Sequence, residues 1–510
     1  MIRKASDIKL KVLPVLFGME HLYYYEGPCR LVDGEALQPG FDKIGNEMFW
    51  KGFLDNIAQY MPAGVEVLEP VRGGRTDDWD NKETMWETFA QAVSGADVAF
   101  VFSNLGVDDL AIEFHLRFPI PMVICPTSSY SPTQVYAALK AKGRGEGLYA
   151  PMSWTRVPLL FTALRARKVI RSTRILLASR GSSTVSYASP DTFADQDRIT
   201  RKLGVLFRHV SIHEVMDQMS PALPGGNPTT PGRRTLDLTE EDRAEMERMA
   251  DELLGGAQYA DVERQYLLNS LAAYLTVKKH MDFADCNAFT APCPDACSTR
   301  RMNEQKFTFC LTHSLLNEQG IPSACEFDAN SALSMQALIA VSGQSPYMGN
   351  TSPLPYENGG FMPLAGLSEE RKAALLADPE NLYYMHHSVP HRCMRRPDKR
   401  EPYGLNHFAY EQKFGAVLRY DFERDRGQVV TVCRFSPDGE KMLIGRGEIV
   451  GGDGFQMPNC RTTVIFRVKD QEDFYRKQLE VGNHCALVFG DYTRELAALA
   501  EVLGVEALMA

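Results

Sequence analysis

The sequence contains no long apolar run, and no stretch approaches the roughly 18 apolar residues that a membrane-spanning helix needs. The first segment, MIRKASDIKLKVLPVLFG, has a short apolar run broken by Pro14 and does not resemble a signal peptide. The 11 cysteines follow no disulfide spacing, which favours reduced thiols. We therefore expect a cytoplasmic protein that makes no membrane contact.

The chain also lacks an excess of basic residues. Its formal net charge is -10 at pH 7, and a protein that binds nucleic acid in bulk normally presents a basic face. No GxGxxG motif follows the first strand pattern of either α/β segment, so a dinucleotide cofactor is not indicated. The acidic net charge and the missing motif therefore argue against bulk nucleic-acid binding and against dinucleotide binding.

The 510 residues are too many for one compact core, and their patterns predict three domains. In residues 1–165, apolar strand patterns alternate with helical ones, which predicts a parallel sheet covered by helices. The same alternation restarts in residues 166–350. Residues 351–510 contain short strand patterns such as GAVLRYDF and RTTVIFRV, and they end in a helix, which predicts an antiparallel β domain.

Two carboxylates, Glu326 and Asp328, occupy the segment ACEFDANSALSMQAL at the start of a helical pattern. Asp328 is well placed to cap that helix. Glu326 caps nothing obvious, so it must face solvent, pair with a cation or bind a metal. We expect an abrupt turn at Gly349–Asn350, where the pattern ends.

Cysteine and histidine also occur near this segment. Cys293, Cys297 and His313 permit a zinc site, but the CxxxC spacing with one distant histidine is weak, and buried thiols are the simpler interpretation.

The segments ACEFDANSALSMQAL and GNHCALVFGDYTRELAALAEVLGV resemble the L-fucose isomerase/L-arabinose isomerase family, and its fucose isomerase-like branch most closely. The resemblance implies two Rossmann-like N-terminal units and a C-terminal domain with an antiparallel β barrel. It implies a metal-dependent aldose–ketose isomerase that acts on a monosaccharide through a cis-enediol. It also implies a homo-oligomer with active sites near subunit interfaces.

Carried over to this sequence, the family pattern assigns a Mn²⁺ or another divalent cation to Glu326, Asn350 and His484. Asn350 stands where the family has an acid, and a neutral amide is a weaker ligand and a poor base. Glu326 and Asp328 are the expected catalytic carboxylates. His387 and Asn483 are expected to contact the sugar. The alternative is a non-catalytic or differently catalytic sugar-binding relative with an altered metal site.

A basic tract, HRCMRRPDKR (residues 391–400), follows His386 and His387. Its cations form either a solvated loop or subunit contact, or a site for an anionic group on the sugar. In the second case Arg392 and Arg395 would bind substrate. Some relatives of this family act on sulfoquinovose, a glucose with a sulfonate at C6, and this makes an anionic substrate a specific expectation.

Overall fold

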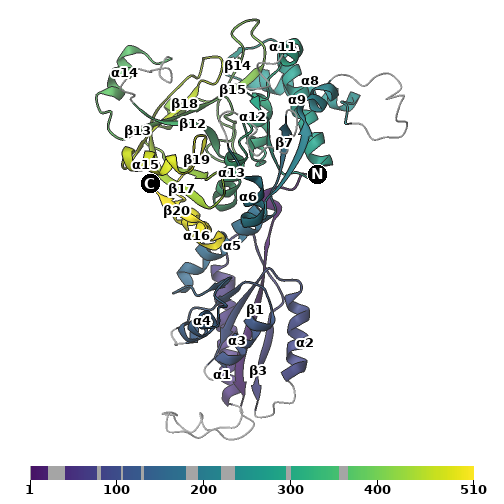
Figure 1. Cartoon of the computed structure of the whole chain (residues 1–510), viewed down its shortest axis with the longest axis vertical. Helices are drawn as coiled ribbons and strands as arrows, with labels where there is room; N and C mark the ends of the chain where they lie inside the picture. The colour runs from purple at the N-terminus through teal and green to yellow at the C-terminus, as the bar shows by residue number, and fades with distance from the viewer. Residues whose placement is uncertain are drawn as a thin grey trace. The chain divides into compact units, whose positions relative to one another are not determined.

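A computed structural model describes residues 2–20, 41–76, 82–104, 107–127, 131–179, 193–219, 236–293, 300–354 and 366–510. Contacts divide the chain into two compact units, one formed by Ile8–Arg165 and the other by Met1–Asp7 with Ala166–Ala510 (Figure 1). The further division of the second unit near residue 350 stays a prediction. Short 3-10 helices lie at η1 (Ala5–Asp7), η3 (Trp154–Arg156) and η5 (Phe422–Asp425).

The unit Ile8–Arg165 is built on a six-stranded parallel sheet of order β2-β1-β4-β5-β6, with β3 also paired to β1. Most of β1 is buried, because helices cover both faces of a parallel sheet. The strands are β1 (Leu10–Glu20), β2 (Val65–Val67), β3 (Val71–Thr76), β4 (Val98–Ser103), β5 (Met122–Ile124) and β6 (Leu148–Tyr149). The helices are α1 (Phe41–Tyr60), α2 (Lys82–Val93), α3 (Asp108–Arg117), α4 (Ser131–Ala141) and the first part of α5 (Val157–Arg171).

The second unit contains another parallel sheet, of order β11-β10-β7-β8. Its strands are β7 (Arg174–Ser179), β8 (Leu206–Ser211), β10 (Ala288–Thr290) and β11 (Ser323–Ala324). The helices around it are α6 (Gln196–Leu203), α7 (Ile212–Gln218), α8 (Glu240–Gly256), α9 (Arg264–Phe283), α11 (Arg300–Gln305), α12 (Cys310–Glu318) and α13 (Ala329–Ser342). Local signals set some boundaries: a capping box between Thr239 and Asp242 starts α8, and Gly204, with φ 75°, ends α6.

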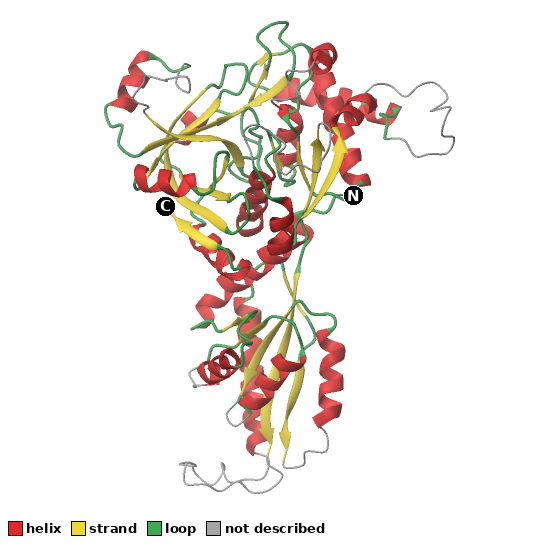
Figure 2. Cartoon of the chain, viewed as in Figure 1, coloured by secondary structure: helices red, strands yellow, loops and turns green. Residues whose placement is uncertain are grey.

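The same unit contains a closed antiparallel barrel of order β16-β19-β12-β13-β18-β17, which β16–β17 pairing completes (Figure 2). Its strands are β12 (Tyr347–Leu354), β13 (Leu382–His387), β16 (Val429–Phe435), β17 (Lys441–Asp453), β18 (Thr462–Val468) and β19 (Cys485–Phe489). β20 (Glu506–Met509) adds to β17, and β9 (Ala260–Asp261), β14 (Gly404–His407) and β15 (Ala416–Arg419) form a small sheet. Helices α14 (Glu369–Leu376), α15 (Gln471–Leu479) and α16 (Thr493–Leu503) complete the unit. The predicted fold class, two parallel α/β parts and an antiparallel barrel, is confirmed.

One local prediction is wrong. Gly349 and Asn350 lie inside β12 and form no turn, because both β13 and β19 pair with this strand. An added Cβ at Gly349 would stand 2.6 Å from the carbonyl oxygen of His386. Glycine at this position therefore allows the two strands to approach closely.

Helix α13 lies between the parallel sheet and the barrel. It packs against β10 and β11 on one side and against β16 and β19 on the other. Every residue from Ala329 to Val341 is buried, which its small alanine and serine side chains allow. The start of this helix is therefore held at the junction of the two parts.

No helix in the described ranges is both long and apolar enough to cross a lipid bilayer. The nine cysteines whose placement the structure describes are all free thiols.

His391, which follows β13 in the chain, is fully buried. Its Nε2 donates to the carbonyl oxygen of Ser345 at 3.1 Å, and Nδ1 finds no partner among the described residues. Burial lowers the pKa of His391 from 6.5 to about 4.

Because this pKa is lower in the folded state, the unfolded chain takes up the proton first, and stability is lost as the pH falls from about 6.5 to about 4. One such histidine accounts for about 3 kcal/mol over that interval. Denaturant unfolding of His391→Gln, which keeps a donor for Ser345, is expected to show a correspondingly weaker acid dependence than the parent protein. Parallel pH curves would contradict this.

Candidate active site

The loop between β11 and α13 holds Glu326 in an unusual backbone conformation. Both Glu326 and Phe327 have φ 61°, in the left-handed region that non-glycine residues rarely adopt. The Phe327 N–H donates to the carbonyl oxygen of Ala291 at 2.8 Å, which ties this loop to the segment after β10. Such strained residues persist only where the surroundings hold them, and they cluster at functional sites.

The carboxylate of Glu326 faces two buried histidines. Oε1 lies 3.1 Å from Nε2 of His387, at the end of β13, and Oε2 lies 3.1 Å from Nε2 of His484, just before β19. Both histidines are fully buried, and Glu326 is 9% exposed. The fold thus brings three residues from distant segments to one point.

The two histidines carry their protons differently. The Ser388 N–H donates to Nδ1 of His387 at 3.0 Å, so Nδ1 is an acceptor and Nε2 donates its proton to Glu326. His484 has the opposite arrangement, because its Nδ1 faces Oδ2 of the Asp328 carboxylate at 3.0 Å and donates to it. In the neutral ring, Nε2 of His484 then has a lone pair directed toward Glu326.

Asp328 is itself held by three groups. Its Oδ1 accepts from the Ser331 N–H at 2.7 Å, so the predicted helix cap is confirmed. Its Oδ2 accepts from Nη1 of Arg434 at 2.8 Å as well as from His484. Arg434 also donates to the carbonyl oxygens of His484 and Val481, each at 2.9 Å. Asp328 therefore fixes the ring of His484, and its expected catalytic role stays a prediction.

The charges of this cluster follow from its burial. Burial acts to raise the pKa of Glu326, but hydrogen bonds from His387 and His484 and the positive charge of His484 outweigh it and hold the pKa well below the ordinary value. Burial also opposes ionisation of Asp328, but Arg434 and His484 lower its pKa. Burial acts to lower the pKa of His484, yet the carboxylates of Asp328 and Glu326 raise it to about 9.

The arrangement fits a divalent cation at Glu326 and His484. Nε2 of His484 is buried and lies 3.1 Å from Oε2 of Glu326. An ionised carboxylate oxygen and an imidazole nitrogen directed at a common point are ligands for Mn²⁺ and similar ions. The Nδ1–H to carboxylate contact of His484 is the support that metal-binding histidines normally have. Cys325, Glu326 and His387 also bring ligand atoms together, but Nε2 of His387 carries a proton.

The other residues predicted to bind metal or sugar lie as follows. Asn350 pairs in register with His386, and its Oδ1 accepts from Nδ2 of Asn483 at 2.5 Å. Asn483 in turn accepts from the Thr351 N–H at 3.0 Å. The two amides thus form a hydrogen-bonded pair, and Asn483 directly precedes His484 in the sequence. The assignment of Asn350 to a metal stays a prediction.

The basic tract is matched by acids of the same chain. Arg392 is buried, and its guanidinium contacts Glu318 at 2.6 Å and Glu252 at 3.0 Å. Nε of Arg395 lies 3.5 Å from Oδ1 of Asp425. The remaining pairs are Arg396–Asp398, Lys399–Glu401, Arg400–Glu252 and Arg400–Glu318. The structure thus gives Arg392 and Arg395 protein partners, and substrate binding by either remains a prediction.

Sequence reasoning missed two buried arginines, Arg434 and Arg419. Arg419 is fully buried and donates to Oγ1 of Thr462 at 3.1 Å and to the carbonyl oxygen of Asn459 at 2.5 Å. Its Nε has no partner, and no carboxylate of the described residues pairs with it. Thr462 stands opposite His387 in the β13–β18 pairing, so this cation lies next to the site. Each arginine interrupts an apolar strand pattern, and that was the available signal.

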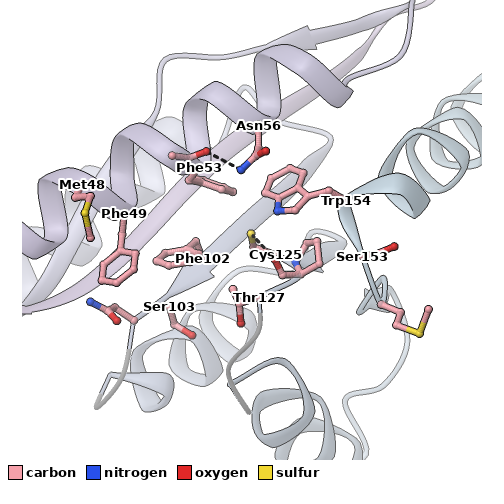
Figure 3. Close-up of a pocket in the computed structure, with 14 residues that line it drawn as sticks. Met48, Phe49, Phe53, Asn56, Phe102, Ser103, Cys125, Thr127, Ser153 and Trp154 are labelled. Atoms are coloured by element: carbon pink, nitrogen blue, oxygen red, sulfur yellow. Dashed lines mark hydrogen bonds between the residues drawn. The ribbon is translucent and has the colours of Figure 1, made fainter.

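A separate pocket of about 720 Å³ lies in the unit Ile8–Arg165 (Figure 3). It opens beyond the carboxyl ends of β4 and β5, where parallel sheets commonly bind ligands. Among the described residues, its lining contains aromatic side chains, namely Phe49, Phe53, Phe102 and Trp154, and no Asp, Glu, Lys, Arg or His. This lining can bind an apolar or planar group.

Comparison with known proteins gives distant matches. No family model matches the chain. It is similar to the sulfoquinovose isomerases of Priestia aryabhattai and Priestia megaterium, each 21% identical over 406 residues, which cover 71% of this chain and 82% of theirs. The sulfoquinovose isomerase of Alkalicoccus urumqiensis is 24% identical over 254 residues, covering 49% of this chain and 47% of its own.

The two buried arginines provide a matched test of the Asp328 network. Removing one partner of a buried ion pair leaves the other charge uncompensated, which costs roughly 3–5 kcal/mol. We expect Arg434→Met to lower the free energy of unfolding by about that amount. Arg419→Met removes a buried cation that has no carboxylate partner, so it is expected to be neutral or stabilising. Denaturant titrations of both variants check this, and equal losses would contradict it.

Proposed function

We propose that this protein is a metal-dependent aldose–ketose isomerase. The observation that carries the proposal is the ionised carboxylate of Glu326, buried between the imidazole of His387, which donates a proton to Oε1, and that of His484, whose Nε2 lies 3.1 Å from Oε2. The names of the distant relatives support the same class of reaction.

Isomerisation of an aldose moves a proton between C2 and C1 and shifts two electrons along the O1–C1–C2–O2 unit through an enediol. A base must accept the proton from one carbon and return it to the other. A divalent cation such as Mn²⁺, when bound, stabilises the charge that develops on the sugar oxygens. Glu326 and His484 are the residues proposed to hold it, with Asn350 as a further ligand through its amide oxygen.

Glu326 is the proposed base. Its lowered pKa keeps it ionised, which both a metal ligand and a proton acceptor require. The proton that His387 donates to Oε1 orients the carboxylate. Asp328 is a positioning residue in this scheme, since both its oxygens are used to hold His484, Arg434 and the start of α13.

The substrate proposed for this isomerase is a sugar with a sulfonate at C6, as the names of the relatives suggest. A buried anion needs paired donors, because an unpaired charge is costly to desolvate. Arg419 supplies a buried guanidinium that has no carboxylate partner, and no acceptor for its Nε, among the described residues. It donates to Thr462, which lies opposite His387 on the neighbouring strand. The resemblance further suggests a cytoplasmic homo-oligomer with its active sites near subunit interfaces.

Glu326→Gln is expected to reduce isomerase turnover by roughly 10²- to 10⁴-fold while the protein stays folded, because proton transfer by one placed base contributes about that factor. Glu423→Gln, which alters a carboxylate paired with Arg371, serves as the control and should keep turnover near normal. Aldose-to-ketose conversion with added Mn²⁺ measures both. Near-normal turnover of Glu326→Gln would exclude Glu326 as the base. A parent protein that binds sugar and converts none would favour the sugar-binding alternative.

The substrate assignment is tested with the 6-sulfonated aldose and its neutral analogue. Hydrogen bonds to a charged group contribute about 1.5–3 kcal/mol, so Arg419→Met should lower kcat/KM for the sulfonated sugar by roughly 10- to 100-fold. The neutral sugar should be affected little. Arg395→Ala is the matched variant in the basic tract and should change neither value. If Arg395→Ala alone reduces use of the sulfonated sugar, the tract binds the anion and Arg419 does not.

A further inference from the structure

A second group of metal-ligating side chains lies next to the site but shares neither Glu326 nor the histidines that face it. Cys293 follows β10, Cys325 follows β11, and His313 lies on α12, which leads into β11. β10 and β11 are parallel neighbours, with Thr290 opposite Ala324, so both cysteines lie beyond the same edge of the sheet. All three residues are buried.

The ligand atoms of these residues converge. The two sulfurs and one imidazole nitrogen all lie within 4.8 Å of one another. The distance from Sγ of Cys293 to Nε2 of His313 is 3.7 Å. Tetrahedral zinc has Zn–S distances of about 2.3 Å and Zn–N distances of about 2.0–2.1 Å, which separate a sulfur and a nitrogen ligand by roughly 3.6 Å. The observed spacing fits that geometry.

The imidazole of His313 is held in the orientation that a metal ligand needs. Its Nδ1 lies 2.7 Å from Oγ of Ser323, and its ring stacks on Phe289 with centroids 5.6 Å apart. Ser323 is fixed in turn by Asn317, whose amide bonds both its N–H and its carbonyl oxygen. With Nδ1–H donated to Ser323, the lone pair of Nε2 points toward the sulfurs, as it does in supported zinc sites.

From this geometry we propose that Cys293, Cys325 and His313 bind a zinc ion, separate from the cation proposed at Glu326. Two thiolates and an imidazole suit Zn²⁺, whereas the carboxylate at the neighbouring site suits a harder ion such as Mn²⁺. These three ligands leave one position of a tetrahedral ion open to water or to a further ligand; Cys297 lies outside the described residues. Binding releases the thiol protons of both cysteines to solvent, so the bound form has Zn²⁺ with two thiolates.

Zinc at this point would brace the active-site loop. It links the segment after β10 to the segment after β11, and Cys325 directly precedes Glu326. The hydrogen bond from the Phe327 N–H to Ala291 already joins the same two segments. The ion adds a second cross-link at the base of the strained residues, and its role is structural.

The test begins with the parent protein, saturated with Zn²⁺, passed through a desalting column and analysed for metal. We expect about one retained zinc ion per chain, because structural zinc sites bind tightly at neutral pH. Replacement by Co²⁺ should produce the near-ultraviolet absorption of a cobalt–thiolate bond. This readout needs no variant, so it decides the proposal even where a substitution prevents folding. An absence of both retained zinc and thiolate absorption would overturn it.

Variants then locate the ion. Cys293→Ser and His313→Gln belong to this cluster alone and should lose the zinc. Ser323→Ala, which removes only the support of His313, should weaken zinc binding by roughly 10- to 100-fold in competition with a chelator. Cys433→Ala, a fully buried thiol in β16, is the control and should retain the ion. Retention by Cys293→Ser and His313→Gln would show that the zinc binds elsewhere.

Glu326→Gln separates this inference from the proposed function. We expect it to abolish isomerisation and keep the zinc. If the parent protein isomerises sugars but retains no zinc, the three residues are a hydrogen-bonded thiol cluster and the isomerase proposal stands. If it retains zinc through Cys293 but isomerises no sugar, the zinc site stands alone.

Discussion

The buried carboxylate of Asp328 joins the α/β part of the second unit to its barrel. It caps α13 through the Ser331 N–H, holds the ring of His484 and pairs with Arg434 of β16. An ionised carboxylate is stable in an apolar interior only when each lone pair meets a donor. The charge of Asp328 is fully hydrogen-bonded only when α13, the residue before β19 and the end of β16 all lie in their folded positions. The site therefore forms only when these three segments come together.

The geometry around Glu326 depends on that agreement. Two successive residues with φ 61° are unfavourable by themselves, and the cost of such conformations is of order 1–3 kcal/mol each. The hydrogen bond to Ala291, the cap of α13 and the contacts of Glu326 with two histidines hold the loop in this form. In this conformation, each carboxylate oxygen of Glu326 lies 3.1 Å from Nε2 of one histidine. A relaxed loop would not present it there.

Local patterns predicted much of the fold and only part of the barrel. Apolar alternation located β16, β17 and β18, whose long strands carry a clear period. It missed β12, which contains glycine and proline, β13, which ends in two histidines, and β19, an apolar run that shows no alternation. These three strands carry or adjoin Asn350, His387 and His484. The site therefore lies where the strand signal is weakest.

What the sequence by itself determined is local: the alternation of strands and helices, the closing helix and the capping position of Asp328. It also marked Glu326 as a carboxylate in need of a partner. Only the tertiary structure decided the partners, since Arg434 and His484 lie 106 and 156 positions from Asp328 along the chain. The same holds for the basic tract, whose cations meet Glu252 and Glu318 on helices far upstream. Contacts of this kind follow from barrel closure and helix packing, and no pattern of neighbouring residues encodes them.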